Sequence, residues 1–176
     1  MGQLAPLSKI KIIIKYFCEN TDPRFLGKVK LMKLFYFLDF IHVKKYGIPI
    51  TYDRYYHLEL GPVPTVIKNM VDAVDENIDD AELADTIQIN INPISGMHRI
   101  ECTKKLNEYE IKVFTKSELQ VLQEVCARFY DKNKQFIVNE SHKEAGWSKT
   151  NYLQEIPYEL AYLDSDNQLE KDELNS

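Results

Sequence analysis

The sequence lacks the short motifs by which the common enzyme classes are recognised. It contains no Gly-x-x-x-x-Gly-Lys phosphate loop, no Gly-x-Gly-x-x-Gly turn and no Gly-x-Ser-x-Gly nucleophile elbow. Cysteine is scarce as well, because Cys18, Cys102 and Cys126 lie far apart with no Cys-x-x-Cys pair among them. This spacing argues against a structural zinc site and favours buried, reduced thiols. We therefore expect no catalytic residues, no metal and no cofactor.

Long apolar runs are also missing from the chain. The densest stretch, Leu34–Leu38, ends at Asp39 and is far too short to span a bilayer. The N-terminus lacks the apolar core of a signal peptide. These observations predict a cytoplasmic protein with no membrane partner. The net charge of −5 argues against nucleic acid as a partner, although residues 1–50 are basic.

What is present is a pattern typical of helices. With 176 residues and 44% hydrophobic content, the chain can bury a core as one domain. Helical spacing of apolar residues predicts a first helix capped by Ser8 and ended by Asp22-Pro23. A second helix is expected over about residues 28–46, apolar on most sides and therefore central, with Gly47 stopping it.

A strand and a rigid corner follow the central helix. Residues 52–60 form an aromatic strand that leads into Gly61-Pro62-Val63-Pro64. The two prolines fix two φ angles, and the glycine can adopt a conformation that other residues avoid. We therefore interpret the segment as a corner, with a third helix that starts at or near Pro64.

The second half of the chain mixes both periodicities. Alternating residues predict a β-hairpin from two strands, over 87–91 and 98–102. Capping boxes at Thr115–Glu118 and Ser141–Glu144 predict a helix and a short helical turn through Trp147. The expected fold is mainly α with a small antiparallel β-sheet, a single domain over residues 1–163 around the central helix 28–46. Residues 164–176 are predicted to be an acidic, disordered tail.

Asp39 and His42 lie three residues apart on the central helix and are therefore neighbours on its surface. They could form a base with its orienting carboxylate, or two metal ligands that await a third. The alternative is a buried polar pair with a structural role, which the apolar surroundings favour because unpaired buried charges are unfavourable.

Four motifs occur together in the order Lys30–Asp39 with His42, Pro49–Tyr55, Leu60–Pro64, and Ser141–Glu144 with Gly146 and Trp147. Over roughly residues 8–163 the chain resembles the SocA-like Panacea domain of bacterial and phage antitoxins and phage-associated proteins. The resemblance implies a mainly helical fold with a small sheet. The motif residues to which we assign structural roles are Asp39, His42, Tyr56, Gly61, Pro62, Pro64, His142, Gly146 and Trp147.

The resemblance also implies a function, namely neutralisation of a toxin encoded beside the protein by direct binding. A variant of this hypothesis is an adaptor that hands the bound toxin to a protease. The alternative hypothesis is a small hydrolytic or metal-dependent enzyme that uses Asp39, His42 and His142. As partner contacts we predict the exposed members of a strand segment beside the corner, with Tyr55 preferred over Tyr56 as the surface residue: Asp53, Arg54, Tyr55 and His57.

Overall fold

The computed structural model describes residues 2–164, and helix α2 (Lys28–Tyr46) is its centre. Every residue from Lys30 to Val43 is buried, as the apolar residues on most sides of this helix predict. Gly47 ends the helix in the left-handed conformation with φ +82°, and its N–H donates to the Val43 carbonyl at 2.7 Å. The central helix and its boundaries are thus confirmed.

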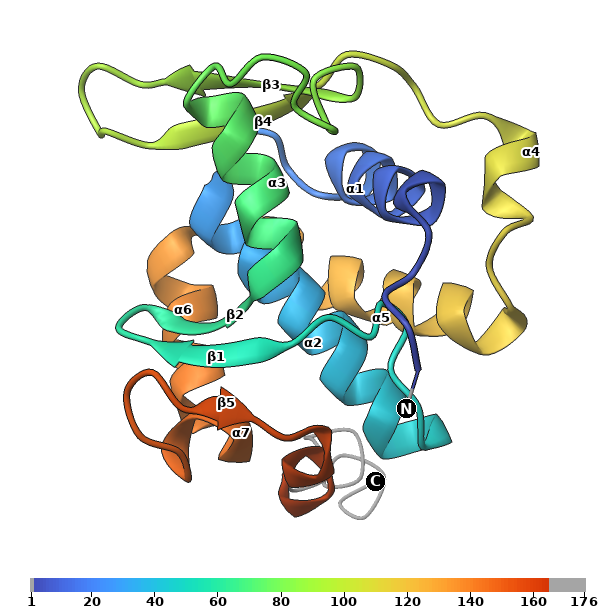
Figure 1. Cartoon of the computed structure of the whole chain (residues 1–176), viewed down its shortest axis with the longest axis vertical. Coiled ribbons are helices and arrows are strands. Elements are labelled where there is room, and N and C mark those ends of the chain that lie inside the picture. The colour runs from blue at the N-terminus through green and yellow to red at the C-terminus, as the bar shows by residue number, and fades with distance from the viewer. Residues whose placement is uncertain (1, 165–176) are drawn as a thin grey trace.

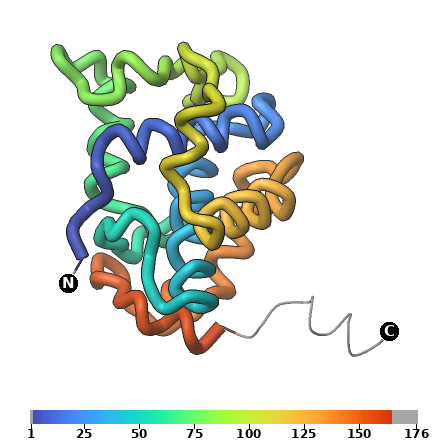
Figure 2. Tube along the Cα trace, turned by 90° about the vertical axis from the view of Figure 1, so that its right-hand side faces the viewer, coloured from blue at the N-terminus to red at the C-terminus, as the bar shows by residue number. Residues whose placement is uncertain are grey.

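Other helices cover α2 from several directions. Figure 1 and Figure 2 show α3 (Thr65–Asp75) and the hairpin that precedes it on one side of α2, and α5 (Lys116–Phe129) on the other. Helix α1 (Leu7–Asn20) crosses above, and the helical turn η1 (Tyr158–Leu163) packs below. The remaining described helices are α4 (Glu108–Ile111), α6 (Lys134–Lys143) and α7 (Ala145–Ser148).

Two small antiparallel sheets decorate this helical core. One has the strand order β2-β1-β5 and is built from β1 (Tyr55–Leu58), β2 (Gly61–Pro64) and β5 (Glu155–Ile156). The other pairs β3 (Ile87–Ile91) with β4 (His98–Cys102), with Ile89 opposite Ile100. The mainly α fold with small antiparallel sheets is therefore confirmed, and so is the predicted hairpin.

The Gly-Pro-Val-Pro segment is a strand and not a corner. Its residues pair with β1, so that Pro64 lies opposite Tyr55 and Gly61 opposite Leu58, and the chain turns at Glu59 and Leu60. Proline is tolerated here because β2 is an edge strand, where N–H groups that face outward need no partner. The third helix does begin directly after Pro64, as expected.

Capping predictions had mixed outcomes. The box at Thr115 is confirmed, because its hydroxyl accepts from the Glu118 N–H at 3.2 Å and Glu118 accepts from the Thr115 N–H at 2.9 Å. The box at Ser141 is wrong, since Ser141 lies inside α6 and its hydroxyl donates to the Val138 carbonyl at 2.7 Å. Ser8 likewise lies inside α1, whose N-terminal flanking residue is Pro6.

Asp164 is the first residue of the predicted tail, and the rest of that tail lies outside the described residues. Its disorder therefore stays a prediction. Across residues 2–164, we find no helix that combines the length and the apolar character needed to cross a bilayer.

Candidate functional site

Asp39 is the centre of a fully buried hydrogen-bond network. Its Oδ1 accepts from the backbone N–H groups of Ile50 and Thr51 at 2.7 and 2.8 Å, and its Oδ2 accepts from the hydroxyls of Thr51 and Tyr55 at 2.5 and 2.6 Å. Burial raises the pKa of the Asp39 carboxyl, and the hydrogen bonds from Thr51 and Tyr55 oppose this shift. The carboxylate thereby fixes residues 50–55 to the central helix.

Asp53 has a comparable role at the start of α3. Its two carboxylate oxygens accept from the backbone N–H groups of Val66 at 3.1 Å and Ile67 at 2.8 Å. These N–H groups belong to the first turn of a helix whose own preceding residue, Pro64, supplies no side-chain cap. Asp53 thus caps α3 from a distance in the sequence, and its side chain is not available to a partner.

The predicted partner contacts are mostly buried. Asp53 and Tyr55 are each 1% exposed and His57 is 8% exposed, so only Arg54 of the four lies at the surface. Tyr55 faces α2, where its ring makes edge-on contacts with the rings of Tyr36 and Phe40. The preference for Tyr55 as the surface residue over Tyr56 is therefore wrong, because Tyr56 is the more exposed of the two.

His42 has its own partners and does not contact Asp39 through a hydrogen bond. Its Nδ1 lies 2.6 Å from the Ile48 carbonyl oxygen, and its Nε2 lies 2.9 Å from the Ser117 hydroxyl. His142 belongs to a different cluster. Within residues 2–164 no group of three His, Cys, Asp or Glu side chains is placed to hold a metal ion. The three residues of the enzyme hypothesis therefore do not form one metal site there.

A second cluster joins the β1–β2 hairpin to α7. The imidazoles of His57 and His142 both stack on the Trp147 indole, with ring centroids 4.4 and 3.9 Å away. The Trp147 Nε1–H donates to the Leu58 carbonyl at 2.9 Å, and His57 Nδ1 lies 2.9 Å from the Thr150 hydroxyl. Two segments that are distant in the sequence, residues 57–58 and residues 142–150, thus meet at one indole ring.

At Gly61 the hairpin approaches side chains of α2 and α6 closely. Its φ is +113°, and a Cβ built there would lie 2.6 Å from the Ser141 hydroxyl oxygen and 2.7 Å from Lys33 Cε. Lys33 passes beneath it and donates from Nζ to the Pro62 carbonyl at 2.9 Å. Burial lowers the pKa of the Lys33 ammonium to about 7.

Gly146 allows a similar close approach on α7. A Cβ at this position would lie 2.9 Å from the Tyr36 hydroxyl and 3.0 Å from a methyl group of Ile156. The structure therefore explains why both motif glycines stand where they do. Neither Lys33 nor Tyr36 was expected to have a special role, although two lysines within the buried apolar stretch of α2, Lys30 and Lys33, are an unusual pattern that could have indicated Lys33.

A groove opens beside Lys33 between α2, α3 and the β1–β2 turn. Its volume is about 400 Å³, and its apolar lining includes Val29, Met32, Val63 and Val71. Exposed apolar side chains lie at its rim and just beyond: Leu60 is 46% exposed, Tyr152 65% and Leu153 62%. Most charged groups that line the groove are paired, since Asp72 contacts both Lys28 and Lys68.

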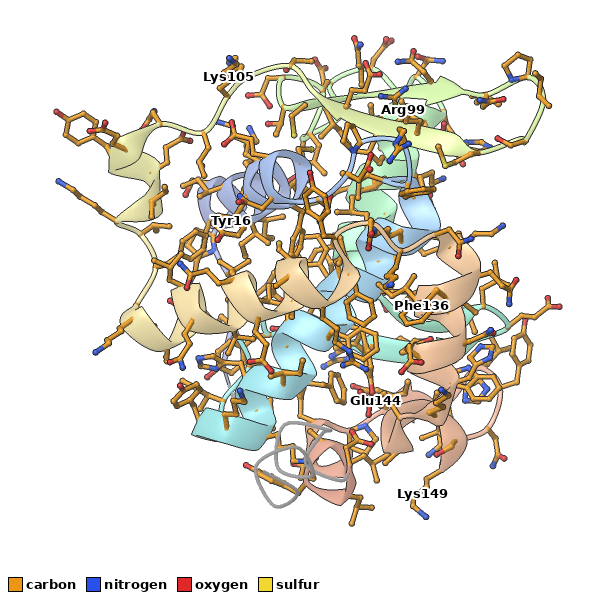
Figure 3. The ribbon with its side chains drawn as sticks, turned by 180° about the vertical axis from the view of Figure 1, so that it is seen from behind. Tyr16, Arg99, Lys105, Phe136, Glu144 and Lys149 are labelled. Carbon is orange, nitrogen blue, oxygen red and sulfur yellow. The ribbon has the colours of Figure 1, made fainter. Side chains whose placement is uncertain are left out.

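The side chains of Glu144 and Asp164 form a pair of carboxyl groups at the connection between α6 and α7. Glu144 follows α6 and faces the central helix (Figure 3), and it forms a hydrogen bond with the side chain of Asp164. Asp164 in turn accepts from the Ala145 N–H at 2.6 Å. Burial, followed by the contact with Asp164, raises the pKa of Glu144 to about 8. Glu144 therefore keeps its proton near neutral pH.

This pair predicts a specific pH dependence of stability. Between about pH 4.5 and 8 the folded state keeps a proton on Glu144 that the unfolded chain has released, so the pair's contribution to stability falls as pH rises. Glu144→Gln should keep the hydrogen bond without this titration. We expect the difference between the melting temperature of Glu144→Gln and that of the wild type to increase in favour of the variant from pH 5 to pH 9. Parallel melting curves across this range would contradict the assignment.

Comparison with family models identifies a family for this chain. A family model described as "Antitoxin SocA-like, Panacea domain" matches residues 31–148 of the 176-residue chain. The matched region begins within α2 and ends with α7, so it contains the Asp39 network, the β1–β2 hairpin and the three stacked rings of the Trp147 cluster. Comparison with curated proteins and with solved structures gave no match.

Proposed function

Since the chain belongs to the antitoxin SocA-like Panacea domain family, we propose that it neutralises a toxin encoded beside it by binding that toxin directly in the cytoplasm. The family description supports an antitoxin-type function, and the match spans more than half of the chain. The bonding of the motif residues also supports a binding protein, since Asp39 and both ring nitrogens of His42 are already engaged in internal hydrogen bonds.

The observation that carries the proposal is an exposed apolar surface at one end of the three-stranded sheet. We call it the rim, and it consists of Leu60 in the β1–β2 turn together with Tyr152 and Leu153 in the loop before β5. Figure 1 shows this turn and this loop at the same end of the sheet. Exposed apolar groups that gather in this way mark interaction sites, and tyrosine is a frequent anchor.

Two further features support the rim as the toxin contact. Leu153 has a φ of +68°, a strained conformation for a branched side chain, and the surrounding bonds hold it there, including its N–H to the His57 carbonyl at 2.8 Å. Arg54 lies at the other end of β1, is 70% exposed, and is a second candidate contact because arginine is often energetic at interfaces.

The test is co-expression with the product of the neighbouring gene. We expect a stable complex and rescue of growth, and we expect Leu60→Ala combined with Tyr152→Ala to weaken the complex by roughly tenfold or more. Ile94→Ala is a matched control, because Ile94 is 97% exposed on the separate β3–β4 hairpin. The control should bind and rescue like the wild type.

The experiment tests the proposed contact surface and the proposed antitoxin function separately. If the double variant folds and still binds and rescues fully, the rim is not the contact surface. If no product of a neighbouring gene binds the wild type, the antitoxin proposal is wrong. The adaptor variant of the proposal stays a prediction, since the acidic tail that suggested it lies almost wholly outside the described residues.

A further inference from the structure

Two fully buried lysines lie three residues apart on α2, and their environments differ. Lys30 Nζ donates to three backbone carbonyls near the end of α5, those of Phe129 at 2.7 Å, Tyr130 at 3.3 Å and Lys132 at 2.6 Å. Its three N–H groups are therefore used. Lys33 is 1% exposed, and the structure gives it one acceptor, the Pro62 carbonyl. Within residues 2–164 the other two of its three N–H groups have no hydrogen-bond acceptor.

Lys33 also lacks a counter-ion. In the described part of the chain it takes part in no ion pair, and burial alone accounts for the lowered pKa. Of the two acids that line the groove, Asp72 is already engaged, since it lies 2.5 Å from Lys28 Nζ and 2.6 Å from Lys68 Nζ, whereas Glu59 lies exposed in the β1–β2 turn. An amine held in such an environment without an anion is unfavourable for stability and is typical of functional sites.

The groove beside this amine has the size and the lining of a ligand site. Its volume of about 400 Å³ falls within the range of small-molecule pockets, and its lining is mostly apolar. Lys33 contributes to the lining as its most deeply buried charged side chain. A second titratable group lies close behind, because burial lowers the pKa of His142, a hydrogen bond with the Glu59 backbone opposes this shift, and the charge of Lys33 adds to it.

We propose that this groove binds a monocarboxylate with an apolar body, whose carboxylate pairs with the Lys33 ammonium while its chain packs on Met32, Val63 and Val71. One compact cation matches one carboxylate, whereas a phosphate dianion would bring a second charge into an apolar lining. The carboxylate can belong to a free acid or to a side chain of a protein partner. This inference does not depend on the proposed antitoxin function.

The proposal has a thermodynamic signature. With a pKa of about 7, Lys33 is largely neutral at pH 8. A bound carboxylate favours the charged amine and raises its pKa, so binding at pH 8 must take up a proton from solution. At pH 6 the amine already carries its proton, and uptake should vanish. A structural lysine that does not meet the ligand would produce neither effect.

The probe is octanoate, measured by isothermal titration calorimetry at pH 6 and pH 8 in buffers with different ionisation enthalpies. We expect binding to the wild type with uptake of close to one proton at pH 8 and none at pH 6. Lys33→Met should weaken octanoate binding about tenfold and abolish the uptake. Lys45→Met is the control, because Lys45 lies on the same helix, pairs with Glu124 at 2.7 Å and does not line the groove.

The wild-type pH series keeps the test decisive even if Lys33→Met does not fold. Absence of octanoate binding, or binding at pH 8 without proton uptake, overturns the proposal, and so does unchanged binding by a folded Lys33→Met protein. Competition identifies the source of the carboxylate. If a co-purified toxin displaces octanoate, the partner supplies the acid, and if both bind together, the natural ligand is a free acid; either result supports the site.

Discussion

Asp39→Ala should remove about 3–5 kcal/mol of folding stability, a large share of the total for a domain of this size. The substitution leaves four buried donors without an acceptor, namely the N–H groups of Ile50 and Thr51 and the hydroxyls of Thr51 and Tyr55. Each unsatisfied buried donor costs about 1–3 kcal/mol, partly recovered as the structure relaxes. Urea unfolding monitored by circular dichroism measures the loss.

Graded variants distinguish this network from a general effect of core truncation. Asp39→Asn keeps the volume and can still accept the two backbone N–H bonds, so it should lose less than Asp39→Ala. Tyr55→Phe removes a single donor and should lose about 1 kcal/mol. If Asp39→Ala is no less stable than Tyr55→Phe, the carboxylate does not organise this region, and the enzyme hypothesis for Asp39 regains weight.

The helices whose signals are local were predicted well from the sequence. Helix α2 carries apolar residues on nearly every side and ends at a glycine that adopts positive φ, so its length and burial could both be inferred. Thr115 and Glu118 satisfy one another's backbone N–H groups within four residues, which is again a local arrangement. Local periodicity and local capping were sufficient there because no distant residue competes with them.

Predictions failed where a distant partner determines the role of a residue. Ser141 begins no helix because α6 already starts at Lys134, after the capping residue Asn133, whose side chain accepts from the Phe136 N–H at 3.0 Å. Tyr55 and Tyr56 are adjacent aromatic residues, and alternation alone does not say which faces the core. Tyr55 faces the core because its hydroxyl donates a hydrogen bond to Asp39, sixteen residues earlier in the sequence.

The contacts around Gly61 could not have been predicted from sequence spacing. Lys33, Gly61 and Ser141 lie on α2, β2 and α6, and they meet only because the hairpin is pressed between the two helices. The family resemblance had singled out Gly61 and the Ser141–Trp147 segment. The unpaired amine beneath them became apparent only from the tertiary contacts, because a lysine in a sequence gives no sign of its counter-ion.

Gly61→Val should be among the most damaging single substitutions in the chain, for two independent reasons. The φ of +113° is strained for a β-branched residue by about 1–3 kcal/mol. The new side chain would also overlap the Ser141 hydroxyl and Lys33 Cε, both held in place by the surrounding core, and overpacking of this kind costs about 1–3 kcal/mol more. Thermal unfolding should therefore show a large fall in melting temperature.

Gly96→Val separates the two causes, because Gly96 also has a positive φ, +71°, but a Cβ there would meet no atom within 4 Å. This control carries backbone strain without steric overlap, so the difference between the two variants measures the packing of the hairpin against Lys33 and Ser141. The overlap also predicts that Gly61→Val, in any fraction that folds, displaces Lys33 and weakens octanoate binding, whereas Gly96→Val leaves it intact. Equal destabilisation by both valines would show that backbone conformation alone accounts for Gly61, and that the hairpin does not hold Lys33 in place.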